Sequence, residues 1–260
     1  MNRPLPAGLP ASDLSPLADG QFVRTDRRPP RTRPLMRKYE VAYLAPNSDG
    51  MTTSRLAPAT QTFESAFMAF ARGTVFSTPS GPVAVEDLHP GDELITADAG
   101  TQRLMWKGAT TVVPGAPGQN EASGRLTRVA TDSRGMGRPS QDLMLGFAAR
   151  LYQGNGTGFF LPATDVIDGI SVIAVTPPSP VRVFHLGLAQ HCRLIANGIE
   201  VESFHPGLAF SGTHRPEMRA LYLSMFPHLR AIEDFGPLRY AREDEERGQS
   251  ATPHDPLVLY

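Results

Sequence analysis

The sequence has one cysteine, no long apolar run and no excess of charge of either sign, and each absence excludes a class of protein. The lone cysteine, Cys192, excludes an internal disulfide and a zinc site built from several thiolates, so burial must stabilise the fold. No segment approaches the roughly 18 apolar residues of a membrane-spanning helix. Arginine and proline stand where a signal peptide has its apolar stretch. We therefore expect a cytoplasmic location and no membrane contact, with leaderless export left open.

The charges nearly cancel, since 25 lysines and arginines stand against 26 aspartates and glutamates. Such a balance argues against a protein whose whole surface binds nucleic acid. Basic residues do gather near the N-terminus, within a proline-rich stretch over residues 1–35. This composition predicts a disordered arm. Its arginines either contact an acidic partner or nucleic acid or simply lie in solvent, and we favour solvent.

Prolines and glycines are abundant, with 25 and 24 residues, and they divide the chain into short segments. Between residues 69 and 96, three β-rich runs alternate with turns that contain proline and glycine. Such spacing is typical of antiparallel hairpins. The strands expected from this pattern cover residues 38–44, 74–78, 83–85, 93–96, 102–113, 126–130, 171–175, 181–188, 191–196 and 199–204.

Two segments have the periodicity of helices. Residues 60–70 carry phenylalanines at helical spacing, and residues 217–226 follow a proline and place apolar side chains on one face. We expect both faces to pack on the β-domain, with a dimer or partner contact as the alternative for the second helix. The charged run over residues 239–247 is expected to be mostly solvated.

The dipeptide Asn197-Gly198 joins two alternating runs and predicts a two-residue hairpin turn. The predicted register pairs Ala196 with Ile199, Leu194 with Val201 and Arg193 with Glu202. The first two pairs share an apolar face, and the third places opposite charges directly across the ladder.

Three blocks of the chain carry recognisable motifs. The first contains Gly73-Thr74, Thr78-Pro79, Gly81, Glu86-Asp87-Leu88 and Gly91-Asp92; the second contains Asp142-Leu143 and Arg150-Leu151; the third contains Phe184-His185-Leu186, His191, Ala196-Asn197-Gly198 and Glu202-Ser203-Phe204. Together they resemble Hint domains, the hedgehog and intein autoprocessing fold, in the form found in many bacterial proteins. The resemblance implies an all-β, Hint-like horseshoe of short antiparallel strands and hairpins, and the two helices predicted from periodicity give it a short N-terminal helix and a C-terminal helix.

On this basis the chain divides into four parts. Residues 1–35 form the basic arm, 36–68 an N-terminal strand and helix extension, 69–207 the Hint-like β-domain, and 208–260 a C-terminal helix and tail.

The resemblance also implies where catalysis would occur. In that family a cysteine or serine precedes the first phenylalanine of the opening block and takes up the acyl group, and here Ala69 stands in that place. The second block normally supplies a hydroxyl and a histidine that polarise and protonate the scissile peptide. Gly146 and Ala149 occupy those positions. No catalytic residue is therefore expected at the family's own positions.

Three residual candidates stay open as non-standard reactive groups: Thr74, His191 and Cys192. The resemblance places the histidine at position 191 near the nucleophile, whereas Cys192 is better explained as a buried structural residue. A metal site shared by His185 and His191 is disfavoured, because six residues of strand separate them by roughly 20 Å. No metal or cofactor is expected.

Three functions are consistent with these observations. The first is a degenerate Hint domain that acts as a structural or protein-interaction module, with the N-terminal arm or the C-terminal helix as its contact surface. The second is cis-acting autoproteolysis or protein splicing that uses a non-standard nucleophile. The third is nucleic-acid binding by the N-terminal arginines, which ranks last because no aromatic or zinc motif accompanies them.

Overall fold

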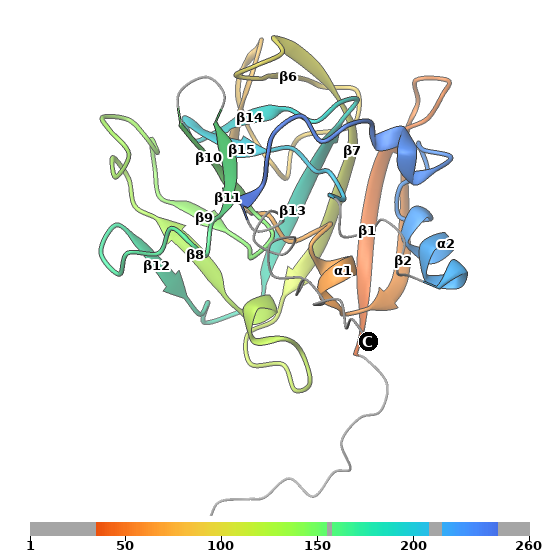
Figure 1. Cartoon of the computed structure of the whole chain (residues 1–260), viewed down its shortest axis with the longest axis horizontal. Helices are drawn as coiled ribbons and strands as arrows, with labels where there is room; N and C mark the ends of the chain where they lie inside the picture. The colour runs from red at the N-terminus through yellow and green to blue at the C-terminus, as the bar shows by residue number, and fades with distance from the viewer. Residues whose placement is uncertain (1–34, 155–157, 208–214, 244–260) are drawn as a thin grey trace, which may run out of the picture. The chain divides into compact units, whose positions relative to one another are not determined.

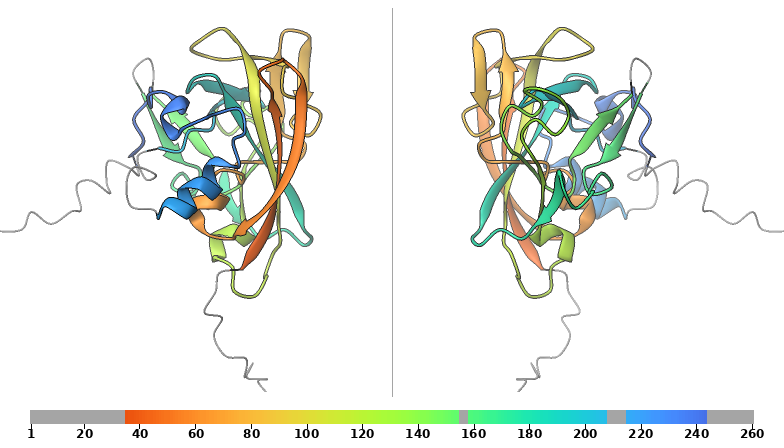
Figure 2. Two further views of the ribbon diagram at one scale, coloured as in Figure 1. Left: turned by 90° about the vertical axis from the view of Figure 1, so that its right-hand side faces the viewer. Right: turned by 90° about the vertical axis from the view of Figure 1, so that its left-hand side faces the viewer.

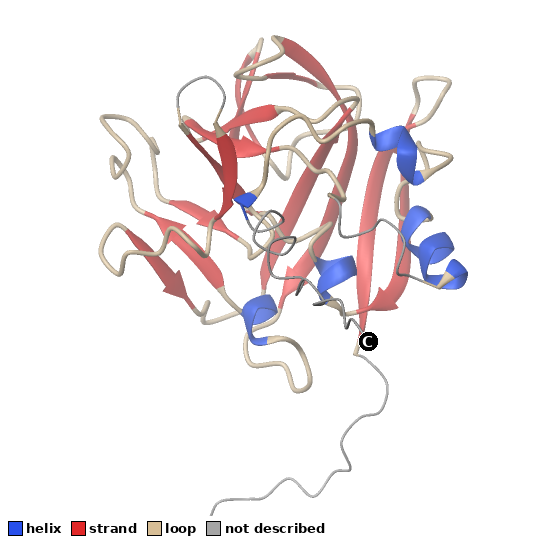
Figure 3. Ribbon diagram, in the orientation of Figure 1, coloured by secondary structure: helices blue, strands red, loops and turns tan. Residues whose placement is uncertain are grey.

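A computed structural model describes residues 35–154, 158–207 and 215–243, all of which belong to one compact unit. Its regular structure is mostly β-strand, and the strand pairs are antiparallel, which confirms the predicted fold class (Figures 1 and 3). Among the described residues, no helix has the length and apolar character needed to cross a membrane. The basic arm lies outside the described residues.

The elements, in chain order, are β1 (Met36–Leu44), β2 (Gly50–Pro58), α1 (Gln61–Glu64), β3 (Phe70–Ala71), β4 (Val75–Thr78), β5 (Gly81–Ala84), β6 (Glu93–Ile95), β7 (Thr101–Val112), a 3-10 helix (Glu121–Gly124), β8 (Leu126–Val129), β9 (Leu143–Leu145), β10 (Arg150–Gln153), β11 (Phe159–Pro162), β12 (Val172–Val175), β13 (Val181–Leu188), β14 (Arg193–Ala196), β15 (Ile199–Glu202), α2 (Pro216–Leu223) and a 3-10 helix (Ile232–Phe235).

The strands form two sheets. The larger has nine strands in the order β12-β8-β9-β3-β13-β7-β1-β2, with β6 also paired to β7. The smaller has six strands in the order β11-β10-β15-β14-β4-β5. Hairpins supply the local pairs, whereas β3 lies between β9 and β13, which are far from it in the sequence. The centre of the larger sheet therefore depends on long-range pairing.

Every strand expected from the sequence is present, with ends that agree to within two residues. Five further strands were not expected: β2, β3, β9, β10 and β11. Of these, β2 pairs with β1 along the whole length of both. It lies at the edge of the larger sheet, and its side chains are mostly exposed. Because an edge strand of this kind buries no continuous face, it shows no apolar alternation in the sequence.

The hairpin around Asn197-Gly198 has the predicted register. Ala196 pairs with Ile199, Leu194 with Val201 and Arg193 with Glu202. Asn197 and Gly198 both have positive φ, 48° and 83°, as a type I′ turn requires. The side chain of Asn197 also accepts a hydrogen bond from the Val75 N–H at 2.7 Å, which ties the turn to β4.

The first predicted helix is shorter than expected. Helix α1 ends at Glu64, and the N–H of Met68 closes a last turn on the Glu64 carbonyl. Phe70 belongs to β3 rather than to this helix. The reason is tertiary, because the chain leaves the helical path where Ala69 begins to hydrogen bond to β13.

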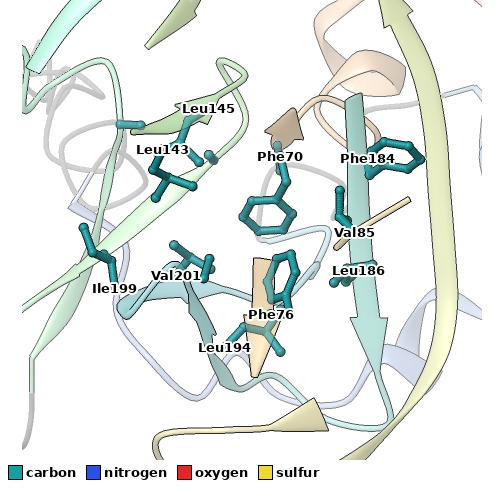
Figure 4. Packing of buried hydrophobic residues seen from close by; sticks show 14 of the residues in the cluster. Phe70, Phe76, Val85, Leu143, Leu145, Phe184, Leu186, Leu194, Ile199 and Val201 are labelled. Carbon is teal, nitrogen blue, oxygen red and sulfur yellow. The ribbon is translucent and has the colours of Figure 1, made fainter. Parts of the chain in front are cut away.

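The main core consists of buried side chains from both sheets, packed against one another (Figure 4). Phe70 of β3 meets Phe76 of β4 in an edge contact with ring centroids 5.0 Å apart. Around this pair lie Leu145 from the larger sheet and Leu194 and Val201 from the smaller one. This core joins all three blocks of the family resemblance.

A second, aromatic core attaches the segments on either side of residues 69–207. Trp106 of β7 packs on Phe67, Phe204 and Phe226, and its indole N–H donates to the Met225 carbonyl at 2.7 Å. Helices α1 and α2 lie side by side here (Figures 1 and 2). The face expected for the C-terminal helix, Met218, Leu221, Tyr222 and Met225, packs in this core, which confirms its predicted role.

A buried ion pair anchors β1 to α1. Arg37 Nε lies 2.9 Å from Glu64 Oε1, and Ser123 donates its hydroxyl to Glu64 Oε2 at 2.5 Å. Glu64 is fully buried, so this pair fixes the N-terminal extension against the loop before β8.

We expect Trp106→Ala to lower the free energy of unfolding by about 3–5 kcal/mol, because it removes the centre of the aromatic core and its hydrogen bond. Urea unfolding followed by circular dichroism would measure the change. Leu56→Ala is the matched control, since Leu56 is 62% exposed and should change the stability by less than about 0.5 kcal/mol. Equal effects of the two substitutions would contradict the assignment of this core.

Candidate functional site

The site implied by the sequence is built around the peptide bond between Met68 and Ala69. Ala69 lies immediately before β3, the central strand of the larger sheet, and its N–H donates to the Phe184 carbonyl of β13 at 3.1 Å. Met68 and Ala69 are both fully buried. The peptide is thus part of the sheet's hydrogen-bond ladder.

The turn after β9 approaches the same peptide from the other side. The Ala148 N–H donates to the Met68 carbonyl at 3.0 Å, and the Gly146 N–H donates to the Ala69 carbonyl at 2.8 Å. Ala149 in turn donates its N–H to the Gly146 carbonyl and shares the main core with Ala69. The structure therefore brings Ala69, Gly146 and Ala149 close together.

The approach at Gly146 leaves no room for a side chain. A Cβ built on Gly146 would lie 2.2 Å from the Met68 carbonyl oxygen and 2.7 Å from the Met68 carbonyl carbon. Both atoms belong to the Met68–Ala69 peptide, which is hydrogen bonded on both sides, so neither can move without breaking a hydrogen bond. A serine or threonine at this position would require the turn or the Met68–Ala69 peptide to shift.

His185 is a titratable side chain next to this segment. Its Nδ1 lies 3.2 Å from the Ser65 carbonyl, and its ring contacts Phe70 at 5.6 Å between centroids. Burial lowers the pKa of His185 to about 3, so the ring is neutral near pH 7. The sequence singled out this residue as part of the third block and as a disfavoured metal ligand, but not for its contact with Ser65, which is 120 positions away.

His191 lies in a different environment. The Arg239 N–H donates to its Nδ1 at 3.2 Å, so the Nε2 proton donates to Glu202 Oε1 at 2.7 Å. Its ring contacts are with Phe160, His205 and Tyr240. These partners belong to the smaller sheet and the C-terminal segment, whereas Ala69 belongs to the larger sheet.

The other two residual candidates, Thr74 and Cys192, are buried. Thr74 donates its hydroxyl to the Ala71 carbonyl at 2.8 Å. Cys192 is fully buried, and burial raises the pKa of its thiol to about 11. A thiol held in the protonated form is a poor nucleophile. In the described part of the chain, no three His, Cys, Asp or Glu side chains are arranged to hold a metal ion.

Glu202 is the centre of a buried charge cluster that the sequence did not reveal. Arg242 Nε lies 2.7 Å from its Oε1, and Arg150 Nη1 lies 3.4 Å from its Oε2. Burial on its own raises the pKa of Glu202, but the charge of Arg242 and the hydrogen bond from His191 outweigh burial and hold the pKa far below its usual range.

Arg193 lies opposite Glu202 in the ladder, as predicted, but its ion pair is with Glu200 at 2.9 Å, because the carboxylate of Glu202 is engaged by buried cations. One residue of the charged run after residue 239 is not in solvent, since Arg242 is only 3% exposed. The partner of Arg242 is Glu202, 40 positions earlier in the chain, and no local sequence pattern predicts such a contact.

A family model described as "Hint domain" matches residues 68–208, more than half of the chain, and the protein therefore belongs to the Hint domain family. Its described residues have a mostly antiparallel β architecture. No curated protein matches the chain.

Several solved structures match about half of the chain. The solution structure of a bacterial intein-like domain from Clostridium thermocellum is 14% identical, with a TM-score of 0.39, and the match covers 53% of this chain and 99% of that one. The crystal structure of the MchDnaB-1 intein (N145AA) is 20% identical, with a TM-score of 0.35, and the match covers 52% and 98%. A splice-inactive variant of the AceL NrdHF class 3 split intein is 11% identical, with a TM-score of 0.38, and the match covers 52% and 97%.

The contact at Gly146 gives one prediction. Gly146→Ala should lower the free energy of unfolding by about 1–3 kcal/mol, because its methyl group would overlap the Met68 carbonyl. Gly50→Ala is the matched control, since a Cβ at Gly50 meets only the Pro90 carbonyl oxygen at 3.9 Å. Chemical denaturation of both variants would measure the difference, and a Gly146→Ala chain as stable as the control would show that the turn is not held as described.

The buried histidines give a second prediction. Burial lowers the pKa of His185 to about 3 and those of His205 and His228 to about 4. Between roughly pH 6.5 and pH 4 the unfolded chain binds protons at these residues and the folded chain does not, so stability falls as the pH falls. His228→Asn should reduce this dependence by about 1.4 kcal/mol per pH unit, the value for one proton. Urea unfolding at about pH 7 and pH 5 would measure it, and an unchanged slope would contradict it.

Proposed function

We propose that this Hint domain does not process itself and that it acts as a structural or protein-interaction module. The observation that carries the proposal is the state of the Met68–Ala69 peptide. Its N–H is hydrogen bonded to β13 and its carbonyl to the turn after β9, and a methyl group stands where the family's nucleophile would be. An acyl shift there has no thiol or hydroxyl to receive the acyl group.

The surroundings of this peptide support the same conclusion. The turn that would carry the assisting hydroxyl and histidine carries Gly146 and Ala149 instead, and the close approach at Gly146 fills the space with backbone. General acid catalysis needs a proton donor within hydrogen-bond reach of the leaving nitrogen. The bond that the Ala69 N–H makes is to the Phe184 carbonyl, which is not a donor.

The alternative, acyl transfer by a non-standard nucleophile, has less support. Thr74 and Cys192 are buried, and the pKa of the thiol is raised. His191 donates to Glu202 and accepts from Arg239, so both of its ring nitrogens are occupied. No specific observation favours any of the three as a reacting group.

Contact surfaces for an interaction module stay as proposed from the sequence. The apolar face of α2 is used within the aromatic core, so a partner at this helix would meet its opposite side, around Glu217 and Ala220. The arm over residues 1–34 remains the other proposed surface. Nucleic-acid binding remains the least favoured of the three functions, because nothing beyond the basic arm supports it.

The test is the intact mass of the purified chain after prolonged incubation near neutral pH, with and without a thiol or hydroxylamine. We expect a single species of 28.2 kDa under every condition. Fragments that end at Met68 or begin at Ala69 would overturn the proposal. Fragments from another position would instead revive the alternative, and Thr74→Val and Cys192→Ser would then show which group reacts.

Ala69→Cys is the matched variant. It restores a thiol at the family's position but leaves Gly146 and Ala149 unchanged. We expect this chain also to stay intact, because the Met68–Ala69 peptide is still held in the sheet and no acid assists the leaving nitrogen. Rapid thiol-dependent cleavage of this variant would show that the loss of the nucleophile is the sole defect.

A further inference from the structure

The C-terminal strap, defined as residues 236–243, follows the range matched by the family model and returns to the smaller sheet. The Phe160 N–H of β11 donates to the Ala241 carbonyl at 2.9 Å, and Phe160 forms a parallel bridge with Arg242. Strand β11 is the last strand on that side of the sheet. The strap therefore adds to a sheet edge in the way that an extended peptide ligand does.

The strap buries one guanidinium group. Arg242 Nε lies 2.7 Å from Glu202 Oε1, and its Nη2 donates to the His205 carbonyl at 2.8 Å. A planar guanidinium suits such a pair of acceptors, because its N–H groups point in fixed, divergent directions. The contacts therefore select arginine by shape as well as by charge.

A second strap side chain is recognised beside it. The Tyr240 hydroxyl donates to Asp98 Oδ2 at 2.8 Å. The guanidinium of Arg193 lies over the rings of Tyr152 and Tyr240, 4.4 Å and 5.5 Å from their centroids. Tyr240 and Arg242 thus both contact the domain, with one residue between them, and Arg239 adds an ion pair with Asp98 at 3.3 Å.

The acceptors belong to the Hint domain, whereas the arginine that fills them does not. Glu202, His205 and Asp98 lie within the matched range of residues 68–208, and Arg242 lies outside it. Glu202 also keeps partners of its own in this range, His191 at 2.7 Å and Arg150 at 3.4 Å. Because those two partners remain when the strap leaves, opening the site does not strand an unpaired buried carboxylate.

We propose that this cluster is an arginine-recognition site of the Hint domain, occupied in cis by Arg242 of the C-terminal strap. When the strap is displaced, the same site takes an extended segment of a partner protein that carries an aromatic residue two positions before an arginine, as Tyr240-Ala241-Arg242 does. The site does not involve the Met68–Ala69 peptide, so cleavage there would leave this proposal unaffected.

The first experiment is chemical rescue of the full-length Arg242→Ala chain. The substitution leaves a guanidinium-sized space beside Glu202, and ethylguanidinium at millimolar concentration should fill it. We expect a higher thermal midpoint with ethylguanidinium than with ethylammonium at the same concentration. Arg182→Ala is the control, because Arg182 is a half-exposed arginine paired with Glu40 at the surface, and its midpoint should not respond.

Alkylation of Cys192 by iodoacetamide gives a second readout on the same proteins. The thiol is fully buried, and Arg239 of the strap donates to the carbonyl of His191 next to it. Weakening the strap should therefore raise the alkylation rate by about tenfold or more through local opening. Ethylguanidinium should reverse most of that increase.

The second experiment tests recognition in trans. A labelled peptide with the strap sequence, residues 236–243, should bind the Arg242→Ala chain more tightly than the unmodified chain, whose site is already filled. The same peptide with lysine in place of its arginine should bind at least about tenfold more weakly, because it loses the second hydrogen bond. If Arg242→Ala does not fold, Arg242→Lys serves in the peptide experiment, because its ammonium cannot form the guanidinium's divergent pair of hydrogen bonds.

A midpoint that responds equally to ethylguanidinium and ethylammonium, or a peptide that binds both chains equally with either arginine or lysine, would overturn the proposal. Arg242 would then be a structural anchor only.

Discussion

The two-residue strand β3 is the constraint on which the larger sheet depends. On one side of it lie β12, β8 and β9, and on the other lie β13, β7, β1 and β2. Its short ladder is extended by the bonds from Ala69 to Phe184 and from the turn at Gly146 and Ala148 back to Met68 and Ala69. If residues 68–71 left this position, the sheet would separate into two halves. Cleavage of the Met68–Ala69 peptide would therefore break the chain directly before the strand that links the two halves of the sheet.

The strands and their hairpins were predictable because their signals are local. Alternation of apolar residues, and turns such as Asn197-Gly198, act over fewer than ten residues and need no knowledge of the rest of the fold. Strand β2 was missed for a physical reason, since at an exposed edge no buried face imposes a pattern. Helix α1 was overestimated because pairing of Ala69 with β13 overrides the helical spacing of the phenylalanines.

The candidate site was predictable only in part. The family blocks singled out Ala69, Gly146 and Ala149 in the sequence, and the hydrogen bonds around Met68 and Ala69 show how the backbone places them beside one another. The backbone contact that excludes a side chain at Gly146 was not predictable, because it joins residues nearly 80 positions apart. The pairing of Glu202 with Arg242 escaped notice for the same reason. Long-range electrostatic contacts leave no periodic trace in a sequence.

The single tryptophan has a spectroscopic consequence. Trp106 belongs to the aromatic core, and the main core between the two sheets contains neither tryptophan nor tyrosine. Its indole is bonded to the carbonyl of Met225, just after α2. Its emission therefore reports the attachment of the C-terminal helix to β7 and is blind to the packing of Phe70 on Phe76. Tryptophan fluorescence of this protein therefore follows the packing of the segments on either side of residues 69–207, and it does not follow the packing of the main core.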